Sequence, residues 1–101
     1  MFTRQQKDSL KEQLVGCLKD EKEVCKIVIF GSFLKSSEPH DIDVAVFPDR
    51  SEKYLLLALK YRRKTRAIAH IIPLDIIPLK TEASSETLTD EIAQGEVIYK
   101  R

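Results

Sequence analysis

Hydrophobic positions follow first a helical and then a strand spacing along the chain, and they predict a succession of helices and strands. Thr3 can cap a helix that runs to about Glu21, because apolar residues at positions 10, 14, 17 and 18 share one helical face. The β-branched run Lys26–Phe30 stops at Gly31 and has the length and composition of a buried strand. The chain is therefore predicted to open with a helix and a strand.

The middle of the chain predicts a loop, a second strand and a second helix. The stretch Ser32–His40 is polar and predicts a loop that contains at most one helical turn. Asp41–Phe47 predicts a second strand that ends at Pro48, with residues 42, 44 and 46 on its core face. Ser51 can cap a helix over Tyr54–Lys64, whose four leucines predict a broad packing face.

The isoleucine-rich segment Ala67–Leu79 predicts a third strand and places His70 in the core. Pro73 and Pro78 interrupt it, and each removes a hydrogen-bond donor. Only the short stretch Leu74–Ile77 is therefore expected to pair regularly.

The last part of the chain predicts a helix over Ser84–Gln94 and a short strand over Val97–Tyr99. The whole order indicates an α/β (α+β) fold in which about four strands form a small mixed sheet flanked by helices. With 101 residues, the chain is long enough for one core, so we expect a single domain over residues 1–101.

Composition and charge narrow the classes of function. Seventeen basic and sixteen acidic side chains give a formal net charge of +1, so bulk electrostatics make nucleic-acid binding improbable. Phosphate recognition would then need a local site. Two cysteines, Cys17 and Cys25, form neither a disulfide framework nor a four-ligand zinc site, and we expect both to be reduced and partly buried. The sequence contains neither a signal peptide nor an apolar run of membrane-spanning length, which favours the cytoplasm.

Two aspartates open the second predicted strand. Residues two apart in a strand project to the same face, so the carboxylates of Asp41 and Asp43 are expected side by side. Such a pair usually needs a cation, and magnesium binds carboxylate oxygens together with the oxygens of a substrate phosphate. Two ions about 4 Å apart can hold the attacking and leaving oxygens of a phosphoryl transfer. The alternative is a merely solvent-facing pair, although aspartate is a poor strand residue.

The pair Gly31-Ser32 directly follows the first predicted strand. Glycine lets the backbone approach a ligand closely, and N–H groups at the following turn together with the Ser32 hydroxyl can hold a phosphate. Alone, the pair indicates no more than an ordinary turn. Next to a strand that opens with two aspartates, it predicts phosphate donors and metal ligands at neighbouring strand ends.

Asp75 lies within the apolar run 71–77, where an unpaired carboxylate would be costly. If its strand lies beside the second one, Asp75 can complete a carboxylate triad. It could then share a metal and accept the proton of an incoming hydroxyl as general base. The alternative is a structural aspartate that binds backbone N–H groups at a strand bend.

These residues together resemble the minimal nucleotidyltransferase family of the DNA polymerase beta superfamily. The resemblance is carried by Gly31-Ser32-Phe33, by Asp41–Phe47 and by Leu74–Ile77, and the segment Glu91–Tyr99 is similar to the usual end of these domains. It covers the chain from about Ile27 to Tyr99.

The resemblance implies a polymerase-beta-like fold in which Gly31 and Ser32 hold a nucleoside triphosphate. Asp41 and Asp43 would bind magnesium, with two ions expected, and Asp75 would be the third carboxylate. The family reaction transfers a nucleoside monophosphate, often AMP from ATP, to a hydroxyl group and releases pyrophosphate. Many minimal members are antitoxins paired with a helical HEPN-domain toxin, and some of them adenylylate a tyrosine of that toxin.

The sequence departs from the family pattern in the loop between Ser32 and Asp41, which is shorter than usual and lacks a further glycine. Lys35 could offset this by contacting phosphate, or it could be an ordinary solvated lysine. The basic segment Lys60–Arg66 could bind an acidic partner or RNA, although a solvated helix end is the simpler interpretation. The acceptor would have to be held by another chain or at an oligomer interface.

Three functions stay open at this point. The first is an active enzyme that transfers a nucleotide to a hydroxyl, and the three aspartates favour it. The second is a binding module that keeps the fold and neutralises a partner protein, which the short loop favours. The third is a structural domain that binds no nucleotide.

Overall fold

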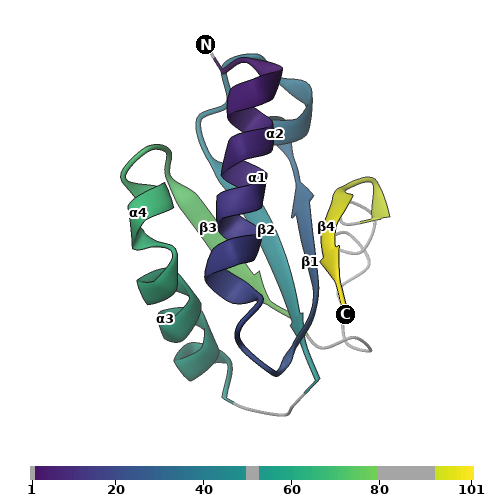
Figure 1. Cartoon of the computed structure of the whole chain (residues 1–101), viewed down its shortest axis with the longest axis vertical. Helices are drawn as coiled ribbons and strands as arrows, with labels where there is room; N and C mark the ends of the chain where they lie inside the picture. The colour runs from purple at the N-terminus through teal and green to yellow at the C-terminus, as the bar shows by residue number, and fades with distance from the viewer. Residues whose placement is uncertain (1, 50–52, 80–92) are drawn as a thin grey trace.

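The computed structural model describes residues 2–49, 53–79 and 93–101. The elements of this part of the chain are, in order, α1 (Arg4–Leu18), β1 (Val24–Phe30), α2 (Ser32–Lys35), β2 (Ile42–Pro48), α3 (Tyr54–Lys64), α4 (Arg66–Ala69), β3 (Leu74–Pro78) and β4 (Glu96–Lys100) (Figure 1). None of these helices is long and apolar enough to cross a bilayer.

The strands form one mixed sheet in the order β3-β2-β1-β4. β1 pairs antiparallel with both β2 and β4, whereas β2 and β3 are parallel. A parallel pair needs a crossover connection, which here runs through α3 and α4. The predicted α/β class and the small mixed sheet flanked by helices are therefore confirmed.

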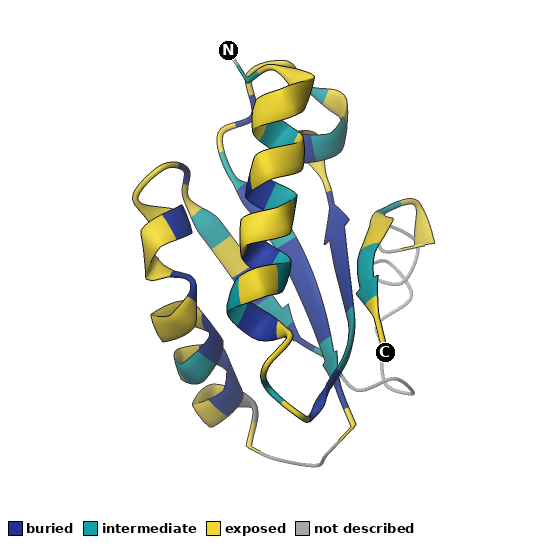
Figure 2. Ribbon diagram, in the orientation of Figure 1, coloured by how far each residue is buried: buried dark blue, intermediate teal, exposed yellow. Residues whose placement is uncertain are grey.

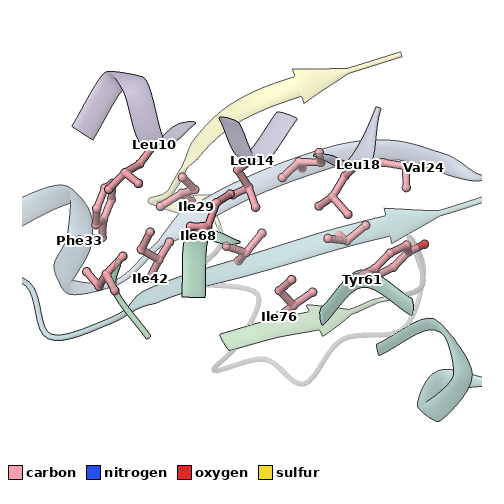
Figure 3. Close-up of a cluster of buried hydrophobic side chains, with 14 of the residues drawn as sticks. Leu10, Leu14, Leu18, Val24, Ile29, Phe33, Ile42, Tyr61, Ile68 and Ile76 are labelled. Atoms are coloured by element: carbon pink, nitrogen blue, oxygen red, sulfur yellow. The ribbon is translucent and has the colours of Figure 1, made fainter. Parts of the chain in front are cut away.

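One face of the sheet carries the main hydrophobic core, which α1, α3 and α4 cover (Figures 1 and 2). Alternate strand residues point into it because successive side chains of a strand face opposite sides. Figure 3 shows these side chains packed between helices and sheet; the core includes Leu10, Leu14, Leu18, Val24, Ile29, Phe33, Ile42, Tyr61, Ile68 and Ile76. The other face has a smaller buried cluster of Val28, Phe30 and Ala45.

α1 begins as the sequence predicts and ends earlier. The Thr3 hydroxyl accepts a hydrogen bond from the Gln6 N–H at 3.1 Å, and the Gln6 side chain accepts one from the Thr3 N–H at 2.8 Å. This reciprocal capping box fixes the first turn. The helix ends at Leu18 rather than near Glu21, and Cys17 on α1 is a free, partly buried thiol, as is Cys25.

The expected strand over Ala67–Leu79 is wrong in its first half. Arg66–Ala69 forms α4 instead, and a hydrogen bond from the Ile72 N–H to the Ile68 carbonyl continues the turn. Ile68 and Ile72 are four residues apart, so a helical turn buries both against the core. Packing therefore outweighs the strand preference of isoleucine, and His70, which the sequence places in the core, is exposed.

Two sequence predictions fall wholly or largely outside the described residues. The proposed cap Ser51 lies in the gap 50–52, and most of the expected helix Ser84–Gln94 lies in the gap 80–92. The last expected strand is confirmed as β4.

A buried carboxylate joins α3 to the turn before β1. Glu23 is only 4% exposed, and it accepts hydrogen bonds from the Lys60 ammonium and, at 3.2 Å, from the Tyr61 hydroxyl. Lys60 and Lys64 also pair with Glu21, with N–O distances of 3.5 and 2.6 Å. Part of the basic segment 60–66 thus neutralises acids of its own chain.

These contacts shift the ionisation of both acids. Burial opposes the charged form of Glu23, but hydrogen bonds from Lys60, its own backbone and Tyr61 outweigh burial and hold its pKa below the ordinary 4.5. A hydrogen bond from Lys64 lowers the pKa of Glu21 in the same direction. A lowered folded-state pKa stabilises the fold above about pH 4.5, and this contribution is lost as the pH falls through the lower folded-state values.

We predict that Lys60→Met lowers the free energy of unfolding by about 1–2 kcal/mol at pH 7, because Glu23 stays buried without its ammonium partner. The difference in the free energy of unfolding between Lys60→Met and the wild type should shrink as the pH falls below 4.5, because Glu23 then takes up a proton. Urea denaturation at both pH values measures this. Lys19→Met, at an exposed lysine of α1's end, is the control, and equal losses in both variants would contradict the role of Lys60.

Candidate functional site

The register of the sheet gathers three strand ends. β1 and β2 are antiparallel, so the end of β1 meets the start of β2, and Phe30 pairs with Asp43. β2 and β3 are parallel, so their starts lie together, and Asp43 pairs with Asp75. The pairing of the strands thus brings Gly31, Asp43 and Asp75 together at neighbouring strand ends.

The paired aspartates lie on the sheet face opposite α1, α3 and α4. Ile42 and Val44 point into the main core, so the intervening Asp43 faces the other side together with its cross-strand neighbour Phe30. Asp43 is half-buried and Asp75 exposed. The site is therefore built on the far side of a rigid sheet, next to the smaller apolar cluster.

Gly31 is held against Asp43. Its φ of +83° lies in a region that L side chains rarely adopt, and it is the only described residue with a positive φ. A Cβ atom added at Gly31 would lie 2.6 Å from Oδ2 of Asp43, too close for any real contact. Both the backbone angle and the approach of the carboxylate therefore require glycine here.

The turn after Gly31 is fixed by a buried aromatic ring. Ser32 starts the four-residue helix α2, and Phe33 beside it is fully buried. The Phe33 ring lies 6.5 Å from that of Phe2, and the Lys7 ammonium lies 5.3 Å from its centroid. Phe33 thus anchors α2 while Ser32 stays exposed. Sequence reasoning named Phe33 only as part of a motif and missed this role, which burial alone reveals.

Two other predicted site residues lie less centrally. Asp41 is half-buried and stands one residue before the start of β2. Lys35 lies at the opposite end of α2 from Ser32 and lines a groove together with Arg4 and Lys7. Gly31, Asp41, Asp43 and Asp75 are not among the residues that line this groove.

The donor set suits a hard cation that takes part of its coordination from a ligand. Among the described residues, no group of three or more acid, histidine or cysteine side chains is arranged to hold a metal. Magnesium is usually bound through one or two carboxylates, with substrate phosphates and water completing its shell. The register pair Asp43 and Asp75, with Asp41 two residues before, fits that manner of binding.

We predict that Gly31→Ala lowers the free energy of unfolding by at least about 1 kcal/mol, because alanine strains the positive φ and displaces the Asp43 carboxylate. Gly16→Ala is the matched control. Nothing lies within 4 Å of a Cβ at Gly16 in α1, so that change should stabilise the protein by about 0.5–1 kcal/mol. Thermal unfolding of both variants measures the change in melting temperature. Equal changes in the two variants would contradict the requirement for glycine at position 31.

Comparison with known proteins places this geometry in a family. The family described as "Polymerase beta, Nucleotidyltransferase" matches residues 12–101. No protein of curated function matches the sequence significantly.

Solved structures show the same fold in toxin–antitoxin complexes. One is the MNT antitoxin in complex with a tri-AMPylated HEPN toxin from Shewanella oneidensis, with 18% identity, a TM-score of 0.63, and coverage of 94% of this chain and 73% of that one. The toxin–antitoxin MntA–HepT matches with 17% identity, a TM-score of 0.65 and coverage of 93% and 73%. A toxin–antitoxin with AMP-PNP matches with 21% identity, a TM-score of 0.70 and coverage of 90% and 73%. The strand register, the glycine that faces an aspartate and the family match agree, and the chain belongs to the polymerase beta nucleotidyltransferase family.

Proposed function

We propose that this protein binds a nucleoside triphosphate with magnesium and transfers its nucleoside monophosphate, AMP from ATP, to a hydroxyl group of a partner protein. The observation that carries the proposal is the pairing of Asp43 with Asp75 beside the positive-φ Gly31. Membership of the nucleotidyltransferase family supports the class of reaction.

Each residue has a proposed role in binding. The exposed backbone at Gly31 and the Ser32 hydroxyl would hold phosphate oxygens, since glycine has no side chain of its own to block the approach of a ligand. Asp41, Asp43 and Asp75 would hold magnesium, which neutralises phosphate charge when bound. Lys35 would need its long side chain to reach the phosphates, so we assign it a supporting role at most.

The proposed reaction is an in-line displacement at the α-phosphorus. The acceptor hydroxyl oxygen forms a bond to this phosphorus, the bond from phosphorus to the bridging oxygen breaks, and pyrophosphate leaves. Asp75 accepts the proton of the hydroxyl, and its exposure leaves room for an acceptor that arrives from outside the chain. This acceptor is proposed to be a tyrosine of a HEPN-like toxin, by analogy with the AMPylated toxin in a structural neighbour.

A second candidate is a binding module that neutralises the partner without catalysis. The observation in its favour is the short loop between Ser32 and Asp41, which lacks the further glycine of the family pattern. The two candidates separate in a labelling experiment with a purified HEPN-domain toxin. Label from the α-phosphate of ATP should appear on the toxin under the first, and label from the γ-phosphate should not. If the protein binds the toxin but transfers no label from the α-phosphate to it, only the second candidate, a non-catalytic binding module, remains.

We predict that Asp43→Asn weakens magnesium-dependent binding of ATP, and any transfer, by about 100-fold, because it removes a charged metal ligand from the centre of the site. Titration calorimetry with and without magnesium measures the binding. Asp20→Asn, at an exposed acid beyond α1, is the control and should bind as the wild type does. Equal affinity of wild type and Asp43→Asn would overturn the proposed site.

A further inference from the structure

The outer face of α3 carries large apolar side chains in water. Its inner residues Leu57 and Tyr61 are buried at 2% and 0% exposure. Leu55, Leu56 and Leu59 on the outer side are 64%, 60% and 45% exposed. Leu59 follows Leu56 by three residues and Leu55 by four, so the three side chains form one stripe along the helix. Isolated exposed leucines are common, whereas three on two turns of one helix indicate a surface that another molecule covers.

Two arginines continue this stripe. Arg62 and Arg63 follow Leu59 at three- and four-residue spacing, and both are exposed. Neither pairs with an acid in the described part of the chain, whereas Lys60 and Lys64 of the same helix bind Glu21 and Glu23. We call Leu55, Leu56, Leu59, Arg62 and Arg63 the α3 face. It combines an apolar half with two positive charges that have no acidic partner among residues 2–49, 53–79 and 93–101.

We propose that the α3 face docks an amphipathic helix of a partner protein, whose apolar stripe covers the leucines and whose acidic residues pair with the arginines. Helices pack side by side through such stripes, and opposite charges at the rim fix their register. Because the carboxylate pair lies on the opposite face of the sheet, this docking requires neither nucleotide nor metal. It goes beyond the proposed transfer reaction and stands without it.

Charge argues against a second copy of this chain as the occupant. α3 contains no acidic residue. If two copies paired antiparallel through this face, the arginines of each would lie on the leucines of the other. If they paired parallel, arginine would face arginine. Neither arrangement brings a carboxylate of α3 to the guanidinium groups, and an unpaired charge is costly in a desolvated contact, so we assign the acids to a different chain.

Two designed amphipathic peptides test the proposal. They share one leucine stripe and differ only in flanking residues, which are glutamate in one and lysine in the other. We expect the acidic peptide to shift the backbone amide signals of residues 55–66 and to bind about ten-fold tighter than the basic one. Arg62→Glu/Arg63→Glu should reverse this preference. Leu56→Gln/Leu59→Gln should weaken binding of both peptides by at least about ten-fold.

The control variant is Val97→Gln, which alters an exposed apolar residue of β4 outside the α3 face and should bind as the wild type does. Equal binding of the two peptides, or shifts confined to another surface, would overturn the proposal. A dimer of the free protein that Leu56→Gln/Leu59→Gln disperses would identify a second copy as the occupant instead. Binding to anionic vesicles or RNA through the same residues would likewise replace a partner helix with a membrane or a nucleic acid.

Discussion

The contact between Gly31 and Asp43 is the constraint on which the candidate site depends. A carboxylate oxygen occupies the space that any side chain at position 31 would fill, and the chain turns there with a positive φ. This contact exists because β1 ends where β2 begins, and the parallel pairing of β2 with β3 then adds Asp75. The turn at Gly31, the pairing of β1 with β2 and the pairing of β2 with β3 therefore bring Gly31, Asp43 and Asp75 together from segments far apart in sequence.

The two faces of the sheet differ: one packs against helices, and the other presents the aspartates. The helix-covered face holds the main core and ties α3 to the turn before β1 through the buried Glu23. The other face presents the aspartates next to a small apolar cluster. Because α1, α3 and α4 pack on the first face, the carboxylates gain a rigid support without being covered by these helices. The α3 face lies outside that core, where a partner can bind without disturbing the strand ends.

Much of this arrangement follows from the sequence, because strand alternation and the position of glycine are local signals. They predict β1 and β2 and the position of Asp43 on the face opposite Ile42 and Val44, whereas Asp41 lies just before β2 begins. The interpretation failed at α4, where long-range burial of Ile68 and Ile72 decides the conformation. It also missed the ion pair of Glu23 with Lys60, since no spacing rule links residues so far apart. Nor could it show that a side chain of another strand excludes all but glycine at position 31.

Paramagnetic broadening by manganese in the presence of a non-hydrolysable ATP analogue tests the central claim most directly. Manganese can replace magnesium at oxygen ligands and broadens the signals of nearby nuclei. The account predicts that the backbone amides of Gly31, Ser32, Asp43 and Asp75 broaden first, and that Asp43→Asn removes the effect. A second groove, between α1 and β4, is lined by the acids Asp8, Glu12 and Glu96. Broadening that centres there, or that persists unchanged in Asp43→Asn, would contradict the account.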